Sequence, residues 1–334
     1  MKKLRWGILS TADIGMKKVT PAIQRAPSCE VVAIASRDMS RARAAAARLG
    51  IPRAHGSYEA LLADPGIDAI YNPLPNHLHV DLTLAALQAG KHVLCEKPMG
   101  LDAADALRLR SAPKGLLVAE AFMVRHHPQW QRARAIAASG ELGEIRAIRA
   151  VFTYFNTDPA NVRNMADIGG GGVLDIGCYP VTAGRYFFAA EPERVIALID
   201  RDPIFGTDRQ ASVIADFGAG RMLTFLISTQ LGGNQSVEIL GTRGRVEIVI
   251  PFNAPPLQST AILIDTGETM DGSLARREII PACDQYTEQA ENFAQAVLGH
   301  KPLDYGIDDA IASMRVLDAI FASEKSGGWA KVGR

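Results

Sequence analysis

The sequence has few cysteines and no apolar run long enough to cross a membrane. Its cysteines lie far apart and form no C-x-x-C pair: Cys29, Cys95, Cys178 and Cys283. Scattered cysteines are typical of reduced thiols in a cytoplasmic protein rather than of a disulfide framework. A transmembrane helix needs about 18 or more consecutive apolar residues, and no such run occurs. The start, MKKLRWGILS, has the charge of a signal peptide without its apolar stretch. We therefore expect a cytoplasmic protein with no membrane partner.

An excess of charge of either sign is also missing. Lys plus Arg and Asp plus Glu both number 36, so the formal net charge is +0. Proteins that bind nucleic acid or membrane surfaces through broad electrostatic attraction carry a marked excess of positive charge. We therefore expect no nucleic-acid partner, although a small basic pocket is compatible with this balance. With 334 residues, of which 48% are hydrophobic, the chain is long enough for about two domains with sizeable cores.

The first third of the chain alternates apolar strand-like segments with helix-like segments. This alternation at short spacing is typical of βαβ units and predicts an α/β Rossmann domain with a doubly wound parallel sheet. The predicted strands are 4–9, 30–36, 68–73, 92–96 and 115–120, and the predicted helices are 16–26, 40–50, 77–90 and 101–111.

The pattern changes after about residue 121. Successive alternating strands separated by short glycine turns, such as FGAGR and GTRGR, predict an α+β domain with an open, mostly antiparallel sheet. We place the domains at 1–121 and 122–334. The predicted strands of the second domain are 144–155, 194–200, 211–217, 221–229, 235–241 and 244–250, and its predicted helices are 128–139, 284–298 and 306–323.

The connection between the first strand and the first helix is a candidate dinucleotide-binding turn. The three positions of a G-x-G-x-x-G fingerprint are occupied by Ser10, Ala12 and Gly15. Such a turn brings backbone N–H groups to a pyrophosphate at a helix N-terminus, and small side chains permit that approach. The motif alone is equally compatible with a strand-to-helix turn that binds nothing.

The end of the second strand indicates which nucleotide would bind. NAD-binding proteins place an acidic residue here, about 20 positions past the turn, to hold the ribose 2′-hydroxyl. This chain has Ser36 and Arg37, with Arg41 one helical turn further on. A guanidinium presents forked donors to phosphate oxygens, so this pattern favours the 2′-phosphate of NADP. Asp38 leaves NAD open, and Arg37 could also be a surface charge.

Two further segments carry candidate catalytic side chains. Lys97 follows the fourth strand within C-E-K-P, at the strand end where doubly wound folds bind ligands. Asp175 and Tyr179 follow a run of glycines, Gly169–Gly172, that predicts a flexible or closely approached loop. In a helix starting near Asp175 the two side chains share one face, and a nearby ammonium would lower the tyrosine pKa. The alternatives are a surface lysine, an N-capping aspartate and a packed tyrosine.

Two histidine pairs raise the question of a metal. His77 and His79 have no cysteine or acidic partner at zinc-like spacing, and His126 and His127 are adjacent, so on a helix they would point apart. We therefore expect no metal site.

Together these segments resemble the glucose–fructose oxidoreductase / inositol dehydrogenase / MocA family over nearly the whole chain. The resemblance rests on GILSTADIG, YNPLPNHLH, CEKP, AEAFMVRHHPQWQ and GGGGVLDIGCYPV. The last two segments are similar to the branch that holds NADP-dependent D-xylose dehydrogenases and dimeric dihydrodiol dehydrogenases. Ser10 departs from the family pattern, which has glycine there.

The resemblance implies roles for individual residues. Tyr179 would take the proton of the reacting hydroxyl, Lys97 would stabilise the phenolate, and Asp175 would orient Tyr179 or bind a neighbouring hydroxyl. The implied substrate-binding residues are Lys97, Arg163, Asp175 and Tyr179, although Arg163 is equally compatible with a surface position. The implied NADP-binding residues are Ser10, Thr11, Ala12, Ile14, Ser36, Arg37, Arg41, Leu74, Asn76, His77, Glu96 and Lys97.

The function expected from these features is an NADP(H)-dependent oxidoreductase acting on a sugar or related cyclic polyol. The favoured reaction is oxidation of an aldose such as D-xylose or D-glucose at C1. One alternative is an aldose–aldose oxidoreductase with tightly bound NADP, and another is keto-sugar or dihydrodiol activity. A catalytically idle NADP sensor is the alternative from a different class. An antiparallel sheet with one face uncovered would favour a homodimer or homotetramer.

Overall fold

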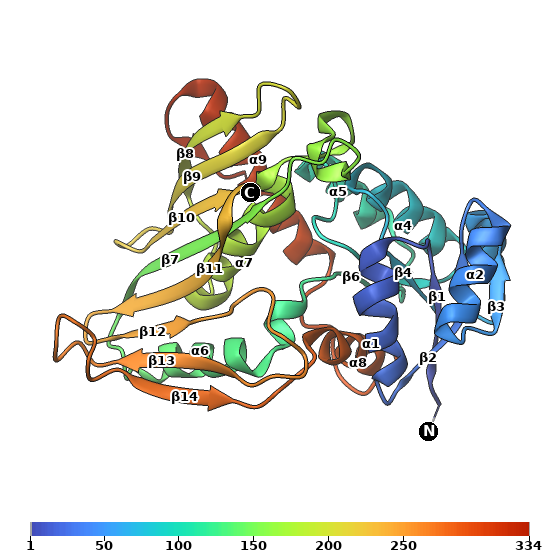
Figure 1. The fold of residues 1–334 in the computed structure, drawn as a ribbon, viewed down its shortest axis with the longest axis horizontal. Helices are drawn as coiled ribbons and strands as arrows, with labels where there is room; N and C mark the ends of the chain where they lie inside the picture. The colour runs from blue at the N-terminus through green and yellow to red at the C-terminus, as the bar shows by residue number, and fades with distance from the viewer. Residues whose placement is uncertain (1, 334) are drawn as a thin grey trace. The chain divides into compact units, whose positions relative to one another are not determined.

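The computed structural model describes residues 2–333, which form two compact units (Figure 1). The first unit contains the chain up to His126 together with Asp284–Ile311, and the second contains His127–Cys283 and the chain from Ala312 onward. The predicted domains, 1–121 and 122–334, follow one another in the sequence. Each of these units instead consists of two separate segments of the chain. The difference lies in the segment 284–311, which returns to the first unit.

The first unit is built on a six-stranded parallel sheet. Its order, β3-β2-β1-β4-β5-β6, is that of dinucleotide-binding folds and confirms the predicted Rossmann domain. The structure adds β3, which the sequence analysis missed because this short strand is partly exposed and lacks apolar alternation. The strands are β1 (Leu4–Ile8), β2 (Cys29–Ala35), β3 (Arg53–His55), β4 (Ala69–Asn72), β5 (His92–Cys95) and β6 (Val118–Glu120).

Helices follow most of these strands, as a doubly wound fold requires. The predicted first helix begins with a π-helical turn, Gly15–Val19, and the helix predicted at 77–90 begins with the 3₁₀ turn Asn76–Leu78. The sequence analysis missed α3. The helices of this unit are α1 (Thr20–Arg25), α2 (Met39–Leu49), α3 (Tyr58–Leu62), α4 (His79–Gln88), α5 (Ala103–Leu107) and α8 (Gln285–Val297).

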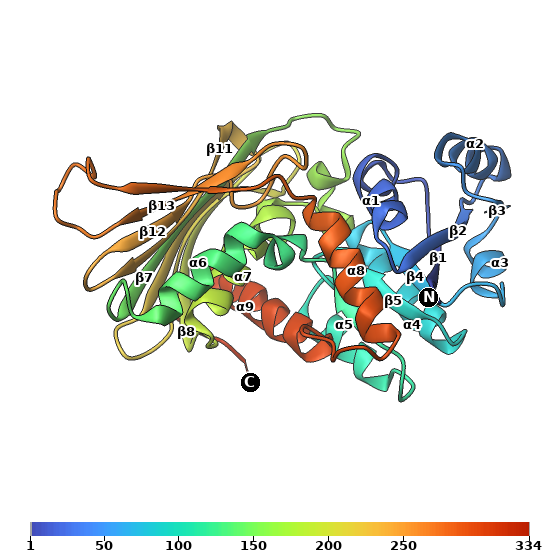
Figure 2. The ribbon, with the colours of Figure 1, turned by 90° about the horizontal axis from the view of Figure 1, so that it is seen from below.

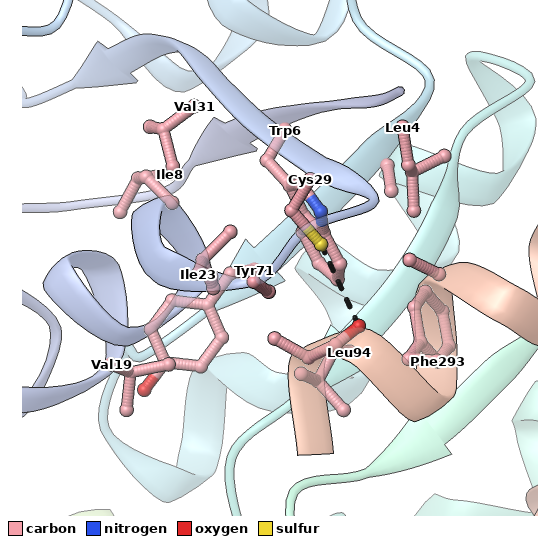
Figure 3. Packing of buried hydrophobic residues seen from close by; sticks show 14 of the residues in the cluster. Leu4, Trp6, Ile8, Val19, Ile23, Cys29, Val31, Tyr71, Leu94 and Phe293 are labelled. Atoms are coloured by element: carbon pink, nitrogen blue, oxygen red, sulfur yellow. Dashed lines mark hydrogen bonds between the residues drawn. The ribbon is translucent and has the colours of Figure 1, made fainter. Parts of the chain in front are cut away.

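Helix α8 belongs to the first unit because its apolar face completes the core of the parallel sheet (Figure 3). The rings of Trp6 and Phe293 lie 5.4 Å apart and are both almost fully buried. The thiol of Cys29 donates a hydrogen bond to the carbonyl of Ala290 at 3.7 Å, and burial raises the pKa of this thiol to about 12. Parallel sheets are covered on both faces, and α8 contributes to this cover at Trp6 and Cys29.

The second unit is built on a nine-stranded sheet. Only β7 and β10 pair in parallel, with Ala150 opposite Phe225, so the prediction of an open, mostly antiparallel sheet is confirmed. The sequence analysis found none of the strands after residue 250. In spatial order the strands are β14 (Arg276–Ile280), β13 (Thr260–Asp265), β12 (Arg245–Ile248), β11 (Gln230–Gly241), β7 (Ile145–Phe155), β10 (Met222–Ser228), β9 (Asp208–Asp216), β8 (Arg194–Arg201) and β15 (Ala330–Lys331).

The helices of the second unit lie along one face of this sheet (Figure 2). They are α6 (Pro128–Ser139), α7 (Cys178–Phe188) and the later part of α9 (Ile307–Ser326). Side chains on the helix-facing side, such as Val213 and Phe225, are buried. On the other side Leu198 is 78% exposed and Ile214 is 39% exposed. In the described part of this unit, the second face of the sheet therefore carries exposed apolar side chains.

Candidate active site

A cleft opens in the first unit where the chain leaves β1, β2 and β4. Strands β2 and β4 flank β1 on opposite sides, so this is the topological switch point at which such sheets bind ligands. The cleft is open to solvent, and its empty space, with part of that solvent included, is about 730 Å³. Seven predicted cofactor residues line it, together with Asp38 and Tyr58: Ser10, Thr11, Ala12, Ser36, Arg37, Arg41 and Leu74.

Ser10 has the backbone of the glycine that it replaces. Its φ is 150°, in a region that residues other than glycine rarely adopt. Its hydroxyl accepts a hydrogen bond from the backbone N–H of Ala12 at 3.1 Å, which offsets part of that strain. A Cβ atom on Gly15 would make only an ordinary van der Waals contact, 3.4 Å from the Cγ atom of Pro73. The turn thus retains the glycine-like backbone at Ser10 that suits a pyrophosphate-binding turn.

The end of β2 presents cations to the cleft. Asp38 caps α2, because its carboxylate accepts hydrogen bonds from the backbone N–H of Ser40 at 2.7 Å and of Arg41 at 3.4 Å. This capping role explains why an acidic residue occurs at position 38 without requiring a contact to the ribose. Arg37 interacts with the hydroxyl of Tyr58, a residue on α3 that the sequence analysis missed together with its helix. Two guanidiniums beside the Ser36 hydroxyl are suited to a phosphate monoester.

The loop after β5 is anchored on both sides of Lys97. Glu96 accepts a hydrogen bond from the hydroxyl of Tyr71 at 2.6 Å, and the backbone N–H of Met99 donates to Glu120 at 2.7 Å. The peptide bond between Lys97 and Pro98 is cis. The loop therefore holds the backbone of Lys97 between two buried contacts at the carboxyl end of its strand.

His79 links this loop to the loop after β4. Its Nδ1 atom lies 2.7 Å from the carbonyl oxygen of Pro98, and its Nε2 atom lies 2.6 Å from that of Leu74. Burial lowers the pKa of His79 to about 4. Both ring nitrogens face backbone carbonyls, so this side chain is not presented to a metal. Among residues 2–333 no group of three or more His, Cys, Asp or Glu side chains could hold a metal ion.

The remaining predicted cofactor residues lie outside the lining of the cleft. Asn76 and His77 form the 3₁₀ turn after β4, and Glu96 and Lys97 follow β5. Ile14 is half-buried and packs against the hydrophobic core of the first unit. A role in cofactor binding therefore remains a prediction for these residues.

The second unit holds a cluster around Asp175. Its carboxylate accepts hydrogen bonds from the Tyr154 hydroxyl at 2.6 Å and from Arg163 Nε at 2.8 Å. Asp175 lies in the π-helical turn Val173–Gly177, and Gly172 is the N-cap, so the alternative of Asp175 as the capping residue is wrong. The structure thus brings together two of the predicted substrate-binding residues, Arg163 and Asp175.

Tyr154 is a member of this cluster that the sequence analysis missed. Tyr154 is the penultimate residue of β7 and lies two positions after the buried Phe152. Strand alternation therefore places both side chains on the same face of the sheet. Burial and the neighbouring Asp175 raise the pKa of Tyr154 far above its ordinary value, so its hydroxyl remains a donor. Two donors, one of them a guanidinium, favour the charged form of the Asp175 carboxylate.

Tyr179 follows within the first turn of α7. It is 6% exposed, and its ring centroid lies 5.4 Å from that of Phe152 and 5.2 Å from that of Phe252. The turn that carries Asp175 continues directly into this helix, so the two side chains are fixed by one backbone segment. Lys97 belongs to the first unit, and its joint action with Tyr179 remains a proposal.

The first unit has a six-stranded Rossmann sheet with a cleft suited to a phosphate, and the second has a mostly antiparallel sheet with a carboxylate cluster. This combination is that of a nicotinamide-dependent oxidoreductase. Residues 4–118 match the oxidoreductase family with an NAD-binding Rossmann fold, and residues 130–247 match the GFO/IDH/MocA C-terminal domain. The chain belongs to the GFO/IDH/MocA family, as the sequence motifs predicted. Among residues 2–333 no helix is long and apolar enough to span a membrane.

Relatives resemble the chain over almost its full length. An uncharacterized oxidoreductase of Rhizobium meliloti is 47% identical, with 99% of this chain and 100% of that protein covered. A D-xylose 1-dehydrogenase (NADP(+)) of Haloferax volcanii is 38% identical, with 97% and 98% covered. The crystal structure of a 3-ketoreductase from Actinomadura kijaniata with NADP and TDP-benzene has a TM-score of 0.89, with 33% identity and 96% and 98% covered. NADP, the cofactor predicted from the sequence, is the cofactor named for the last two.

Removal of the Tyr154 hydroxyl tests whether the cluster holds Asp175 as a charged acceptor. Tyr154→Phe leaves the ring in place and removes one of the two donors. We expect the free energy of unfolding to fall by about 1.5–3 kcal/mol, the range for a hydrogen bond to a charged group. Urea unfolding at pH 7 measures it, with Tyr305→Phe as the control. A loss no larger than in the control would contradict the importance of this hydrogen bond.

Proposed function

We propose that the chain is an NADP(H)-dependent oxidoreductase that transfers hydride between nicotinamide and a sugar or related cyclic polyol. Oxidation of an aldose such as D-xylose or D-glucose at C1 is the reaction that we favour. The observation that carries the proposal is the cleft in which Ser36, Arg37 and Arg41 present one hydroxyl and two guanidiniums. The 38% identity to an NADP-dependent D-xylose 1-dehydrogenase over 97% of the chain supports the same cofactor and substrate class.

The first unit would hold the cofactor. Backbone N–H groups of the turn Ser10–Ala12 would bind the pyrophosphate, which suits a turn with a glycine-like backbone at Ser10. Arg37 and Arg41 would bind the 2′-phosphate, because a phosphate monoester needs forked cationic donors. Bound NADP supplies the hydride acceptor for the oxidation.

The second unit would hold the sugar. Asp175, kept charged by Tyr154 and Arg163, would accept a hydrogen bond from a substrate hydroxyl next to the reacting one. Tyr179 would take the proton of the reacting hydroxyl. An unperturbed tyrosine has a pKa near 10, so this role needs a nearby cation, which Lys97 would provide. The reverse direction, in which Tyr179 donates a proton to a carbonyl, uses the same groups.

Reduction of a keto-sugar is a second candidate function. The observation that favours it is the likeness to the 3-ketoreductase, whose structure matches with a TM-score of 0.89 at 33% identity. The same site serves both directions, so the two candidates differ in substrate rather than in chemistry. Assays in both directions separate them: formation of NADPH with aldoses supports the first, and NADPH consumption with keto-sugars alone supports the second.

Replacement of Lys97 and Tyr179 tests the catalytic roles. The wild-type protein is mixed with NADP⁺ and a panel of aldoses, inositols and dihydrodiols, and NADPH absorbance is followed. With the best substrate, we expect Lys97→Ala and Tyr179→Phe to lower kcat by about 10²–10⁴-fold, the usual contribution of general acid–base catalysis. The Kd for NADP⁺ should change little in Tyr179→Phe. The exposed Lys114, replaced by Ala, is the control.

Unchanged turnover in folded Lys97→Ala or Tyr179→Phe would contradict these roles. A wild-type protein without turnover of any sugar in either direction would contradict the proposed function itself. Turnover of paired sugars without added cofactor would instead favour the aldose–aldose alternative with retained NADP.

Replacement of the cleft arginines tests the choice of cofactor. Arg37→Ala removes one guanidinium from the 2′-phosphate, so we expect the Kd for NADP⁺ to rise about 10–100-fold, from the 1.5–3 kcal/mol of a charge-assisted hydrogen bond. The Kd for NAD⁺, which lacks this phosphate, should stay within twofold. Arg43→Ala, on the same helix as Arg41 but outside the cleft lining, is the control. Parallel weakening of both cofactors would contradict the assignment.

We also propose that the chain forms a homodimer or homotetramer through the uncovered face of the second sheet. Leu198 and Ile214 lie on adjacent strands of that face and are exposed. Leu198→Glu should lower the mass measured by light scattering to that of a monomer, because burying an unpaired carboxylate is costly. Leu257→Glu, at a 91% exposed loop residue, is the control. An unchanged assembly in Leu198→Glu would contradict this interface.

A further inference from the structure

We infer that Asp208 is a positioning residue for the reaction proposed above: it fixes the start of the helical segment that carries Asp175 and Tyr179. The inference rests on that proposed function. Asp208 is the first residue of β9, and nothing in the sequence motifs points to it. Its role follows from three observations on the second unit.

The first observation is a cap supplied from a distant strand. Asp208 is 2% exposed, and its Oδ2 atom accepts a hydrogen bond from the backbone N–H of Val173 at 2.5 Å, across 35 positions of sequence. The helical turn has no cap of its own, because its N-cap residue, Gly172, has no side chain. Helix starts need an acceptor for their free N–H groups, usually a local Ser, Thr, Asp or Asn. Asp208 performs this function from the sheet.

The second observation explains the glycine run. A Cβ atom on Gly171 would lie 2.0 Å from Oδ1 of Asp208, and one on Gly172 would lie 3.1 Å from the backbone oxygen of Asp208. Gly171 also has a φ of 120°, which side chains rarely tolerate. The sequence analysis predicted a flexible or closely approached loop here. The structure supports the second alternative, since the carboxylate packs directly against the backbone of this loop.

The third observation is electrostatic. Burial raises the pKa of Asp208 to about 6, with Arg201 lowering it and Glu324 raising it further. Arg201 is itself paired with Glu324, its Nε atom 2.7 Å from Oε1. A buried charge without a dedicated counter-ion is costly, and the positive end of a helix is one of the few places that favours it. The hydrogen bond that Asp208 accepts from the Val173 N–H favours the charged form of the carboxylate and opposes the effect of burial.

The consequence concerns geometry rather than cofactor binding. Release of the Val173 N–H would free the first turn, and Asp175 lies within that turn. Its hydrogen bonds to Tyr154 and Arg163 depend on where that turn holds the carboxylate. The residues proposed to bind NADP belong to the first unit. Loss of the cap should therefore lower kcat and leave the affinity for NADP⁺ intact.

Three variants and three readouts test this inference. Asp208→Ala removes the acceptor, and Asp208→Asn keeps an acceptor oxygen without the charge. Asp216→Ala is the control, since Asp216 ends the same strand and accepts from the backbone N–H of Gly218 in a turn away from the helix start. The readouts are steady-state kinetics with the best sugar and hydrogen exchange of the amides in Val173–Gly177, together with the Kd for NADP⁺.

We expect Asp208→Ala to lower kcat at least tenfold, with the Kd for NADP⁺ within twofold of the wild type and faster exchange confined to Val173–Gly177. Asp208→Asn should recover kcat to within about threefold of the wild type, and Asp216→Ala should match the wild type. A folded Asp208→Ala protein with wild-type kcat and wild-type exchange would overturn the inference. So would an equal loss of NADP⁺ affinity, because that would indicate general disruption.

If Asp208→Ala does not fold, Gly171→Ala decides the question, because its Cβ atom displaces the carboxylate, and exchange of the Val173 amide separates loss of the cap from the strain of a side chain at this φ. A folded Gly171→Ala protein with wild-type kcat or wild-type exchange of the Val173 amide would overturn the inference. A tenfold loss of kcat with faster exchange of that amide and intact NADP⁺ affinity would support it. Failure of the proposed function is recognised separately, as a wild-type protein that turns over no sugar. In that case the exchange of the Val173 amide still reports whether Asp208 caps the turn.

Discussion

The candidate site of the second unit is organised around the contacts of one carboxylate in a largely enclosed position. The side chain of Asp175 is 13% exposed and joins three segments through its hydrogen bonds: the end of β7, the loop that contains Arg163 and the helix that continues to Tyr179. Each segment contributes to the position of this carboxylate. The strand alternation brings Tyr154 inward, the glycines let the loop turn back, and Asp208 holds the helix start. A carboxylate held in this way can order sugar hydroxyls, which are weak ligands in water.

The first unit meets a different requirement, the close approach of backbone to an anion. Ser10 shows that the requirement concerns backbone geometry rather than the glycine residue, because its φ of 150° is one that glycine usually supplies. Asp38 shows the converse. An acidic residue at the position expected to select NAD caps its own helix, and the neighbouring arginines face the cleft. Residue identity at a motif position is thus a weaker guide than the contact that the side chain makes.

The sequence predicted the layers of both units and the position of the cleft, because apolar periodicity and turn residues are local signals. Seven of the predicted cofactor residues line the cleft: local signals indicated Ser10, Ala12, Ser36, Arg37 and Arg41, and the family resemblance implied Thr11 and Leu74. Tyr58 was missed because β3 and α3 are too short to show a period. Tyr154 could have been found from its alternation with Phe152, but its partner, Asp175, lies on another element. Asp208 caps a helix start 35 positions away, and α8 packs on a sheet that is distant in the sequence. No local pattern in the sequence indicates either contact.

The return of α8 to the first unit has a consequence for the exchange of parts between relatives. The chain leaves the first unit at His126, re-enters it at Asp284 and leaves it again after Ile311, so each unit consists of two separate segments. A single crossover near residue 126 would join a parallel sheet from one parent to an α8 from another, and the contact between Trp6 and Phe293 would then pair residues from different parents. Chimeras that keep each core intact need junctions at all three crossings. In natural recombination, the two aromatic residues are therefore expected to be inherited as a pair.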